Sequence, residues 1–217
     1  MPDQFVDALR RVVEEELIPA LRLESRQPTE PVVVVDLPAP WREVGTGNYA
    51  AVFAHPDYPE WVVKVYAPGR PGIEEETEVY RRLGKHPAYS ECLFAGGSYL
   101  VVRRLEGVSL WDAFQQGLDV PERVIRDVDD ALEYARGRGL LPHDVHARNV
   151  MMHDGRGLVV DISDFLHPDP CNRWRDLKRA YFWLYRPVVM RLGLRVPERL
   201  LNGVRHLHRA CKRVLPA

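Results

Sequence analysis

The chain has 217 residues, 46% of them hydrophobic and 28% charged, which is ordinary for a globular protein with a sizeable core. Its three cysteines, Cys92, Cys171 and Cys211, lie far apart and include no CxxC pair, which argues against a disulfide framework or a zinc knuckle and predicts a cytoplasmic protein. The acidic, interrupted N-terminus is not the pattern of a signal peptide, and no apolar run approaches the roughly 18 residues of a membrane helix, so we expect no membrane span.

The first part of the chain is predicted to be mostly β-structure. A helix is expected over residues 3–23, because Val6, Leu9, Val13 and Leu17 recur at helical spacing. The elements expected after it are an extended stretch around VVVV at 32–35, strands within 41–65, a helix over 73–83 and two strands within 93–105.

The last part of the chain is predicted to be mostly helical, and the two parts meet near residues 103–107. The elements expected here are helices over 109–117 and 121–138, a polar loop PHDVHARNV at 142–150, a strand LVVD ending at Asp161, and a helical stretch from Arg173 that is broken at Pro187 and near Pro197. Together the two parts predict an α+β fold.

The C-terminal segment is basic, although the whole chain has a formal net charge of only −1. Residues 186–217 contain eight Lys or Arg and one acid, a net charge of +7, which leaves −8 for residues 1–185. An apolar stripe runs through the same segment at Leu200, Leu201, Val204, Leu207, Cys211 and Val214. Two interpretations stay open: a helix with a solvated basic face, or a docking surface for an anionic partner such as an acidic protein, RNA or lipid headgroups.

A glycine-rich turn, GTGNYAAV at 45–52, lies between two predicted strands. Glycines allow a backbone to approach phosphate oxygens closely and to present N–H groups to them. The alternative is a plain hairpin, because glycine is common in turns of every kind.

A lysine and a glutamate follow this turn at positions where they can pair. Lys64 stands between valines in the next strand, so it lies on the opposite face from both of them. Glu76 shares the apolar stripe that continues to Leu83, and a buried carboxylate there needs a cation such as Lys64. Glu75 and Glu78 remain alternative partners, and the acidic run is also what a helix dipole favours in a first turn.

The polar loop brings further oxygen-bearing side chains. Asp144 and Asn149 are five residues apart, and Asp161 is the last residue of the next predicted strand. These three can supply a general base and two oxygen ligands for a hard cation such as Mg²⁺. With a glycine-rich turn and a Lys–Glu pair upstream, they complete the set of groups that phosphoryl transfer requires.

In this order the motifs resemble those of the protein-kinase-like superfamily, over roughly residues 41–185. The resemblance implies a bilobal fold with a small antiparallel β N-lobe carrying one αC-type helix, and a reduced, mainly helical C-lobe. It implies a helical extension at residues 1–30, an N-lobe at 31–104 and a C-lobe at 105–217. It also implies ATP bound between the lobes, Mg²⁺ as cofactor, and an acceptor that bears a hydroxyl group.

The same resemblance assigns the site residues. Those implied to bind ATP are Gly45, Gly47, Ala50 and Val52 in the glycine-rich loop, Lys64 with its helix partner Glu76, and Arg103 and Leu105 in the hinge. Those implied to act in catalysis are Asp144 as the base, Lys64 on the phosphates and His146 near the γ-phosphate, with Asn149 and Asp161 as metal ligands. Asp176 resembles the buried aspartate of the helix that braces the catalytic loop.

The chain also departs from the family pattern. Pro142 and His143 precede Asp144 in place of His-Arg, so the arginine that answers a phosphate on the activation loop is missing and no such switch is expected. Asp161 is followed by Ile-Ser in place of Phe-Gly, and Asp164 is a rival for its metal position. No Ala-Pro-Glu segment exists, which predicts a missing or reduced peptide-docking platform.

Other features point to particular branches of the superfamily. His146, two residues after the aspartate, is similar to aminoglycoside and choline kinases. The compact end resembles RIO-type and lipopolysaccharide-core (Kdo/heptose) kinases and small bacterial Ser/Thr kinase-like proteins. Three hypotheses follow: a compact bacterial Ser/Thr protein kinase, a kinase of a small molecule or glycolipid, and a pseudokinase that binds nucleotide without turnover. Substrate choice is set by loops that sequence patterns describe poorly.

Overall fold

The structure, a computed structural model, describes residues 3–27, 29–192 and 195–196, and it consists of two units. The first unit contains the described residues up to Leu105, together with Ala131–His143 and Ile162–Pro168. The second contains Glu106–Asp130, Asp144–Asp161 and the described residues from Asp169 onward. The chain therefore passes between the units several times, and each unit is built from separate stretches of sequence.

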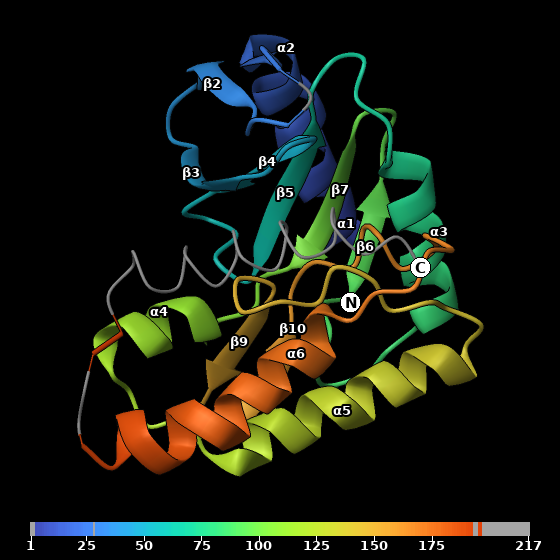
Figure 1. The fold of residues 1–217 in the computed structure, drawn as a ribbon. Helices are drawn as coiled ribbons and strands as arrows, with labels where there is room; N and C mark the ends of the chain where they lie inside the picture. Colours follow the sequence, from blue (N-terminus) through green and yellow to red (C-terminus); the bar gives the residue numbers. More distant parts are fainter. Residues whose placement is uncertain (1–2, 28, 193–194, 197–217) are drawn as a thin grey trace. The chain divides into compact units, whose positions relative to one another are not determined.

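The first unit is organised around an antiparallel sheet of five strands in the order β3-β4-β5-β7-β6 (Figure 1). Its strands are β3 (Arg42–Thr46), β4 (Ala50–Ala54), β5 (Trp61–Tyr66), β6 (Cys92–Ala95) and β7 (Tyr99–Arg103). The helix α3 (Ile73–Leu83) connects β5 to β6, and β1 (Arg22–Glu24) pairs with β2 (Val33–Asp36) in a separate ribbon. This order places the glycine-rich turn, at the β3–β4 hairpin, beside the strand that carries Lys64.

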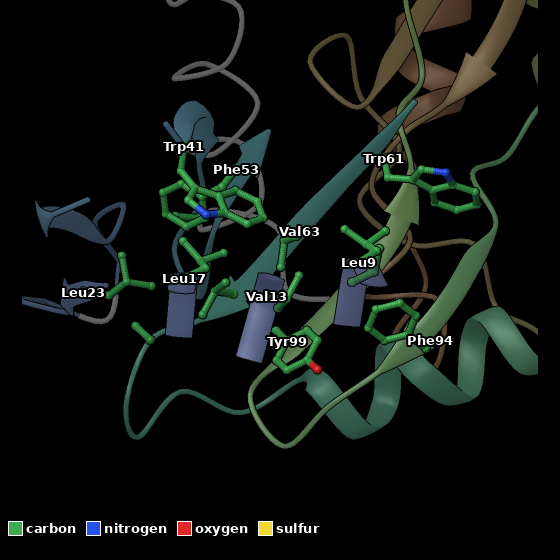
Figure 2. Packing of buried hydrophobic residues seen from close by; sticks show 14 of the residues in the cluster. Leu9, Val13, Leu17, Leu23, Trp41, Phe53, Trp61, Val63, Phe94 and Tyr99 are labelled. Atoms are coloured by element: carbon green, nitrogen blue, oxygen red, sulfur yellow. The ribbon is translucent and has the colours of Figure 1, made fainter. Parts of the chain in front are cut away.

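The N-terminal segment forms part of the core of this unit. It folds as α1 (Asp3–Arg11), a π-helical stretch η1 (Val12–Leu17) and the short α2 (Ile18–Ala20). Leu9, Val13 and Leu17 lie one turn apart and are fully buried among side chains of the sheet such as Phe53 and Val63 (Figure 2). Burying an aliphatic side chain of this size contributes roughly 1.5–3 kcal/mol. The segment therefore covers one face of the sheet and stabilises it.

The expected helix over residues 3–23 is shorter than predicted. It ends at Ala20, and Leu21 takes an extended backbone with ψ of 130°. Residues 22–24 then pair with β2, because a β ribbon supplies the backbone hydrogen bonds that the end of the helix no longer provides. Periodicity alone did not reveal this switch, since Leu23 is buried in either arrangement.

The second unit combines a small sheet with helices. Its strands β8 (Val108–Ser109), β9 (Val150–His153) and β10 (Arg156–Val159) form an antiparallel sheet in the order β10-β9-β8. Its helices are α4 (Leu110–Gln116), the first part of α5 (Glu122–Gly137), α6 (Arg173–Ala180) and the π-helical η2 (Tyr181–Met190). Ser109 caps α4 by accepting a hydrogen bond from the Asp112 N–H at 3.0 Å, and the left-handed Gly117 ends the helix.

Two aspartates of α5 fasten the rest of this unit to the helix. Asp127 accepts hydrogen bonds from Arg156 Nε at 2.7 Å and from the Gly157 N–H at 3.0 Å. Asp129 accepts from Trp174 Nε1 and Lys178 Nζ, each at 2.7 Å. Together these bonds join β10 and α6 to the same helix.

The predicted break at Pro187 is wrong. Pro187 lies inside η2, whose buried side chains Tyr181, Tyr185 and Val189 continue on both sides of it. Proline removes a backbone donor and crowds the preceding turn of an α-helix, and the wider π-helical turn accommodates both effects. Pro197 and the basic stripe from Leu200 to Val214 lie outside the described residues. Within the described part of the chain, no helix is long and apolar enough to cross a membrane.

Candidate active site

The glycine-rich turn forms the β3–β4 hairpin of the first unit. Gly45 lies opposite Val52, and the Gly47 N–H donates to the Ala50 carbonyl at 2.8 Å. Neither glycine has a positive φ, and a Cβ on Gly45 would meet nothing within 4 Å. A Cβ on Gly47 would meet only the Ala50 carbonyl oxygen, at 3.7 Å. The chain itself therefore does not require glycine at these positions, whereas a ligand that approaches the backbone closely would.

The other two predicted residues of the loop, Ala50 and Val52, lie in β4, which pairs with β5. Val52 lies opposite Lys64, and Ala50 lies opposite Tyr66. Ala50 is buried, so its methyl group is accommodated inside the unit. The strand pairing thus connects the hairpin to the lysine without an intervening element.

Lys64 and Glu76 form an ion pair within the first unit. The Nζ of Lys64 lies 2.7 Å from Oε2 of Glu76, whose side chain is only 1% exposed, against 17% for the lysine. The same Oε2 accepts a hydrogen bond from the Tyr66 hydroxyl. A carboxylate so deeply buried is tolerated because a cation and a hydroxyl donor compensate for its lost hydration.

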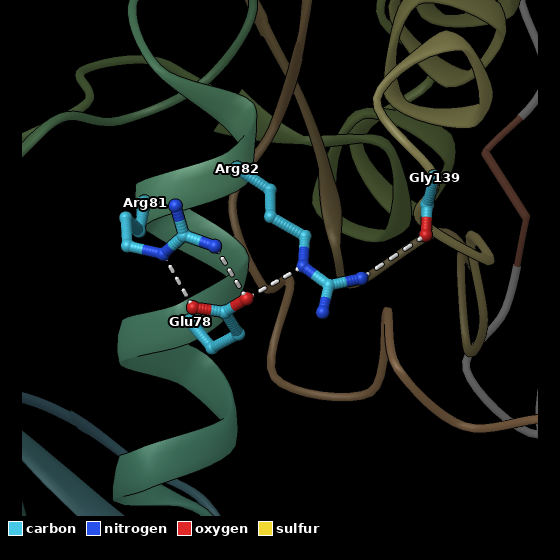
Figure 3. A network of polar contacts seen from close by, with 4 residues as sticks. All are labelled: Glu78, Arg81, Arg82 and Gly139. Carbon is cyan, nitrogen blue, oxygen red and sulfur yellow. Dashed lines mark hydrogen bonds and ion pairs between the residues drawn. The ribbon is translucent and has the colours of Figure 1, made fainter.

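Glu78, an alternative partner, is engaged elsewhere. Its carboxylate accepts hydrogen bonds from Arg81 Nε at 2.6 Å and Arg82 Nε at 2.7 Å, and Arg82 continues to the Gly139 carbonyl at 3.4 Å (Figure 3). The hydrogen bonds from Arg81 and then Arg82 lower the pKa of Glu78 to about 2. Glu75, the other alternative, is exposed on α3. Glu76 is therefore the glutamate that pairs with Lys64.

The expected hinge follows β7, in the first unit. Both backbone groups of Arg103 are engaged, since its N–H donates to the Glu91 carbonyl at 2.8 Å and its carbonyl accepts from Ser90 Oγ at 2.6 Å. The Arg104 N–H donates to the Glu60 carbonyl at 2.8 Å. The backbone of Arg103, one of the two predicted hinge residues, is therefore already engaged within the first unit.

The predicted catalytic loop belongs to the second unit. Asp144 has a φ of 54°, in the left-handed region that residues other than glycine seldom adopt. Asn149 Nδ2 donates to the Asp144 carbonyl at 3.2 Å, and the Asn149 N–H donates to the His146 carbonyl at 2.9 Å. His146 Nε2 lies 3.8 Å from Asp144 Oδ1. Strained backbone that is held by surrounding bonds is found preferentially at functional sites.

An arginine of α6 reaches the same aspartate. Arg173 Nη1 donates to Asp144 Oδ1, which places a guanidinium directly on the predicted base. Asp144 therefore has a cationic neighbour, although the arginine that precedes the aspartate in the family pattern is replaced by His143. Oδ1 is the carboxylate oxygen of Asp144 that Arg173 contacts.

Asn149 and Asp161 are brought together by the backbone of the second unit. The Val160 N–H donates to the Asn149 carbonyl at 3.1 Å, so Asp161 follows immediately after this contact. The Asn149 amide nitrogen is used in the bond to Asp144, which leaves its oxygen as the ligand end. An amide oxygen and a carboxylate suit Mg²⁺, so the donors present fit the expected ion.

Two details here differ from the sequence predictions. The strand β10 ends at Val159, so Asp161 lies just beyond the strand and not at its last position. Asp176 is not fully buried, because its side chain is 36% exposed and lies 3.6 Å from Arg175. Asp164, the rival metal ligand, belongs to the first unit, and its carbonyl accepts from the His167 N–H at 3.0 Å.

Two residues of these sites were missed by the sequence analysis. The position of Tyr66 beside Lys64 could have been predicted, because residues two apart in a strand have side chains on the same face. Arg173 gave no such signal, since it lies 29 residues after Asp144 and reaches it only through the position of α6.

Two known proteins similar to this chain are named as kinases. No family model matches the chain. A Bacillus subtilis protein named "Putative serine/threonine-protein kinase YrzF" is 30% identical over 149 residues, which cover 67% of this chain and 69% of that protein. Among solved structures, the Mycobacterium tuberculosis PknI kinase domain is 27% identical with a TM-score of 0.42, and the match covers 56% of this chain and 58% of that domain. The chain belongs to the protein-kinase-like superfamily, so the predicted protein-kinase-like α+β fold and the predicted phosphotransferase class are confirmed.

Proposed function

We propose that this kinase transfers the γ-phosphoryl group of ATP, with Mg²⁺, to a hydroxyl group of a protein serine or threonine. In the first unit, the backbone of the glycine-rich turn (45–52) approaches the phosphates. Lys64, fixed by Glu76, binds the α- and β-phosphates as a point charge. The observation that carries the proposal is this buried ion pair beside a hairpin whose glycines the chain itself does not need.

The second unit supplies the groups for the chemical step. Asp144 accepts the proton of the acceptor hydroxyl while the hydroxyl oxygen bonds to the γ-phosphorus. The bond from that phosphorus to the β–γ bridging oxygen breaks, and ADP leaves. Asn149 and Asp161 would hold Mg²⁺, which neutralises negative charge on the phosphates when bound. Because Asn149 and Arg173 hold Asp144 on its left-handed backbone, the base is oriented before the acceptor arrives.

A small molecule or glycolipid is the second candidate acceptor, and one observation favours it. Between Asp161 and the start of α6 at Arg173, the described residues 162–172 form only turns and loop. A segment of this length offers little surface on which an extended peptide could dock. Assay of the purified kinase against a protein panel and against alcohols, sugars and aminoglycosides decides between the two acceptor classes.

The dependence on ATP and Mg²⁺ is tested by nucleotide binding. A fluorescent ATP analogue is titrated into the wild type, Asp161→Asn and Asp164→Asn, each with Mg²⁺ and with EDTA. We expect Mg²⁺ to tighten binding about tenfold or more in the wild type and in Asp164→Asn, and to lose this effect in Asp161→Asn. Loss in Asp164→Asn alone would transfer the metal role to Asp164, and no nucleotide binding by the wild type would refute the proposal.

A further inference from the structure

Tyr66 shares the Glu76 carboxylate with Lys64. The two residues stand two apart in β5, so their side chains leave the strand on the same face. Tyr66 is buried, and its backbone is fixed by pairing with Ala50 and by an N–H bond to the Ser98 carbonyl at 2.8 Å. Its ring therefore starts from a rigid strand and reaches the helix that carries the glutamate.

The Tyr66 hydroxyl meets two groups of α3. It donates to Oε2 of Glu76, the oxygen that also lies 2.7 Å from Lys64 Nζ, and it lies 3.3 Å from the Gly72 carbonyl oxygen. A phenol has one proton to donate, and a bond to an ionised carboxylate is the stronger of the two. The hydroxyl is thus committed to Glu76, with Gly72 as a longer secondary contact.

Gly72 shows that the ring also packs against the start of the helix. It is the N-cap of α3 with a φ of 115°, and its carbonyl accepts the Glu76 N–H at 2.9 Å. A Cβ at this position would lie 3.1 Å from Cε1 of Tyr66. Glycine is therefore required twice here, for its backbone conformation and for the approach of the tyrosine. Tyr66 therefore contacts the first turn of α3 at Gly72, where the helix begins, and at Glu76, one turn later.

We propose that Tyr66 is a positioning residue of the nucleotide site, whose hydroxyl latches α3 to β5 and so keeps Glu76 at the Lys64 amine. This inference rests on the proposed role of Lys64 in binding the ATP phosphates. A lysine alone is a poor anchor, because its four-carbon stem has many rotamers. A tyrosine has two side-chain torsions and reaches the same oxygen from a fixed strand, so it restricts the carboxylate to one position.

Cys92 of β6 offers a readout that does not depend on catalysis. Its thiol is half-buried, and burial together with the negative charge of Glu76 raises its pKa to about 11. Thiolate is the form that alkylating reagents attack, so the native thiol should react slowly. If α3 loosens or Glu76 moves away, the burial of Cys92 and the effect of the Glu76 charge both decrease. The pKa of the thiol then falls, and alkylation of Cys92 becomes faster.

The test compares Tyr66→Phe, which keeps the ring and removes the hydroxyl, with Tyr99→Phe. Tyr99 is a matched control, since it is buried in the same sheet and its hydroxyl donates to the Glu14 carboxylate at 2.7 Å. Alkylation by iodoacetamide is followed by mass spectrometry on the Cys92 peptide, and kcat and KM for ATP are measured on the same samples. Circular dichroism checks that both variants are folded.

We expect Tyr66→Phe to accelerate alkylation of Cys92 about tenfold or more and to lower kcat about tenfold, with KM for ATP changed less than about threefold. Tyr99→Phe should match the wild type in all three quantities. Equal alkylation and turnover in the two variants would overturn the proposal, and faster alkylation with unchanged kcat would overturn the positioning role. If the wild type shows no turnover, the proposed function fails, and the alkylation rate alone decides whether the latch exists.

Discussion

Arg173 and Asp144 lie 29 residues apart in the chain and form an ion pair in the second unit. The guanidinium of α6 donates to one carboxylate oxygen of a residue whose backbone φ is 54°, in the left-handed region. The pair gives this kinase a cation at its predicted base without the arginine that usually precedes it in the sequence. The orientation of Asp144 therefore depends on the folding of α6.

Removal of this guanidinium should slow the chemical step. We expect Arg173→Ala to lower kcat about 10- to 100-fold, because Asp144 loses the bond that orients it, and to change KM for ATP little. Arg173→Lys should recover part of the rate, since it restores the charge without the fork geometry. Addition of guanidinium ion to Arg173→Ala should raise its turnover, whereas a merely structural role would give no rescue.

Removing one partner of the buried ion pair should lower the free energy of unfolding more than removing both. Lys64→Met should lower the free energy of unfolding by about 2–4 kcal/mol, because it leaves the Glu76 carboxylate buried without this cation. The double variant Lys64→Met/Glu76→Gln should recover most of that loss, since the remaining amide carries no charge. Urea unfolding at neutral pH measures both, with Lys85→Met, an exposed lysine, as the control. Equal losses in the single and double variants would contradict this account of the pair.

Gly45 should matter for nucleotide binding and not for folding. A Cβ at Gly45 would meet nothing within 4 Å, so Gly45→Ala should change the free energy of unfolding by less than about 1 kcal/mol. Binding of ATP should weaken about tenfold, because the added methyl group occupies the space through which phosphates approach. Gly97→Ala is the matched control, since its Cβ would also be free of contacts. Equal ATP affinity in the two variants would contradict the proposal that this turn binds the phosphates of ATP.

Glu78 should make the stability of the folded protein depend on pH in the acidic range. Its pKa, about 2 in the folded protein, lies below its ordinary value of 4.5, because Arg81 and Arg82 donate hydrogen bonds to the ionised form. The ionised carboxylate therefore stabilises the folded state above about pH 4.5, and this stabilisation is lost as the pH falls towards 2. The difference in Tm between the wild type and Glu78→Gln should shrink from pH 6 to pH 3. The exposed Glu75→Gln should show no such trend, and a constant difference for Glu78→Gln would contradict the assignment.

Local patterns in the sequence were sufficient for several parts of the fold and site. The helix over 73–83 was predicted with its observed bounds, because Pro68 and Pro71 break the chain before it and an apolar stripe runs through it to Leu83. The same stripe showed that Glu76 must be buried, and the need to compensate a buried carboxylate pointed to Lys64. These inferences worked because each depends on a few neighbouring residues and one strong energetic requirement.

Other features depended on the tertiary structure. The contact of Arg173 with Asp144 requires the position of α6, and the left-handed backbone of Asp144 is imposed by its surroundings. Pro187 was expected to break a helix, but it lies inside a π-helical stretch whose residues Tyr181 and Tyr185 are buried. Both are cases in which tertiary packing overrides a local rule.

The proposal that Asp144 accepts the proton of a hydroxyl attacking the γ-phosphorus of ATP is tested by transfer of labelled phosphate. Wild type and Asp144→Ala are incubated with ATP labelled in the γ-phosphate and Mg²⁺, with no added substrate and then with the protein panel and the small alcohols. We predict label on a protein or small-molecule hydroxyl with the wild type, a rate lowered at least about 100-fold in Asp144→Ala, and equal ATP binding by both. Equal rates of transfer by the two proteins, or ATP binding with no transfer to any acceptor, would contradict it.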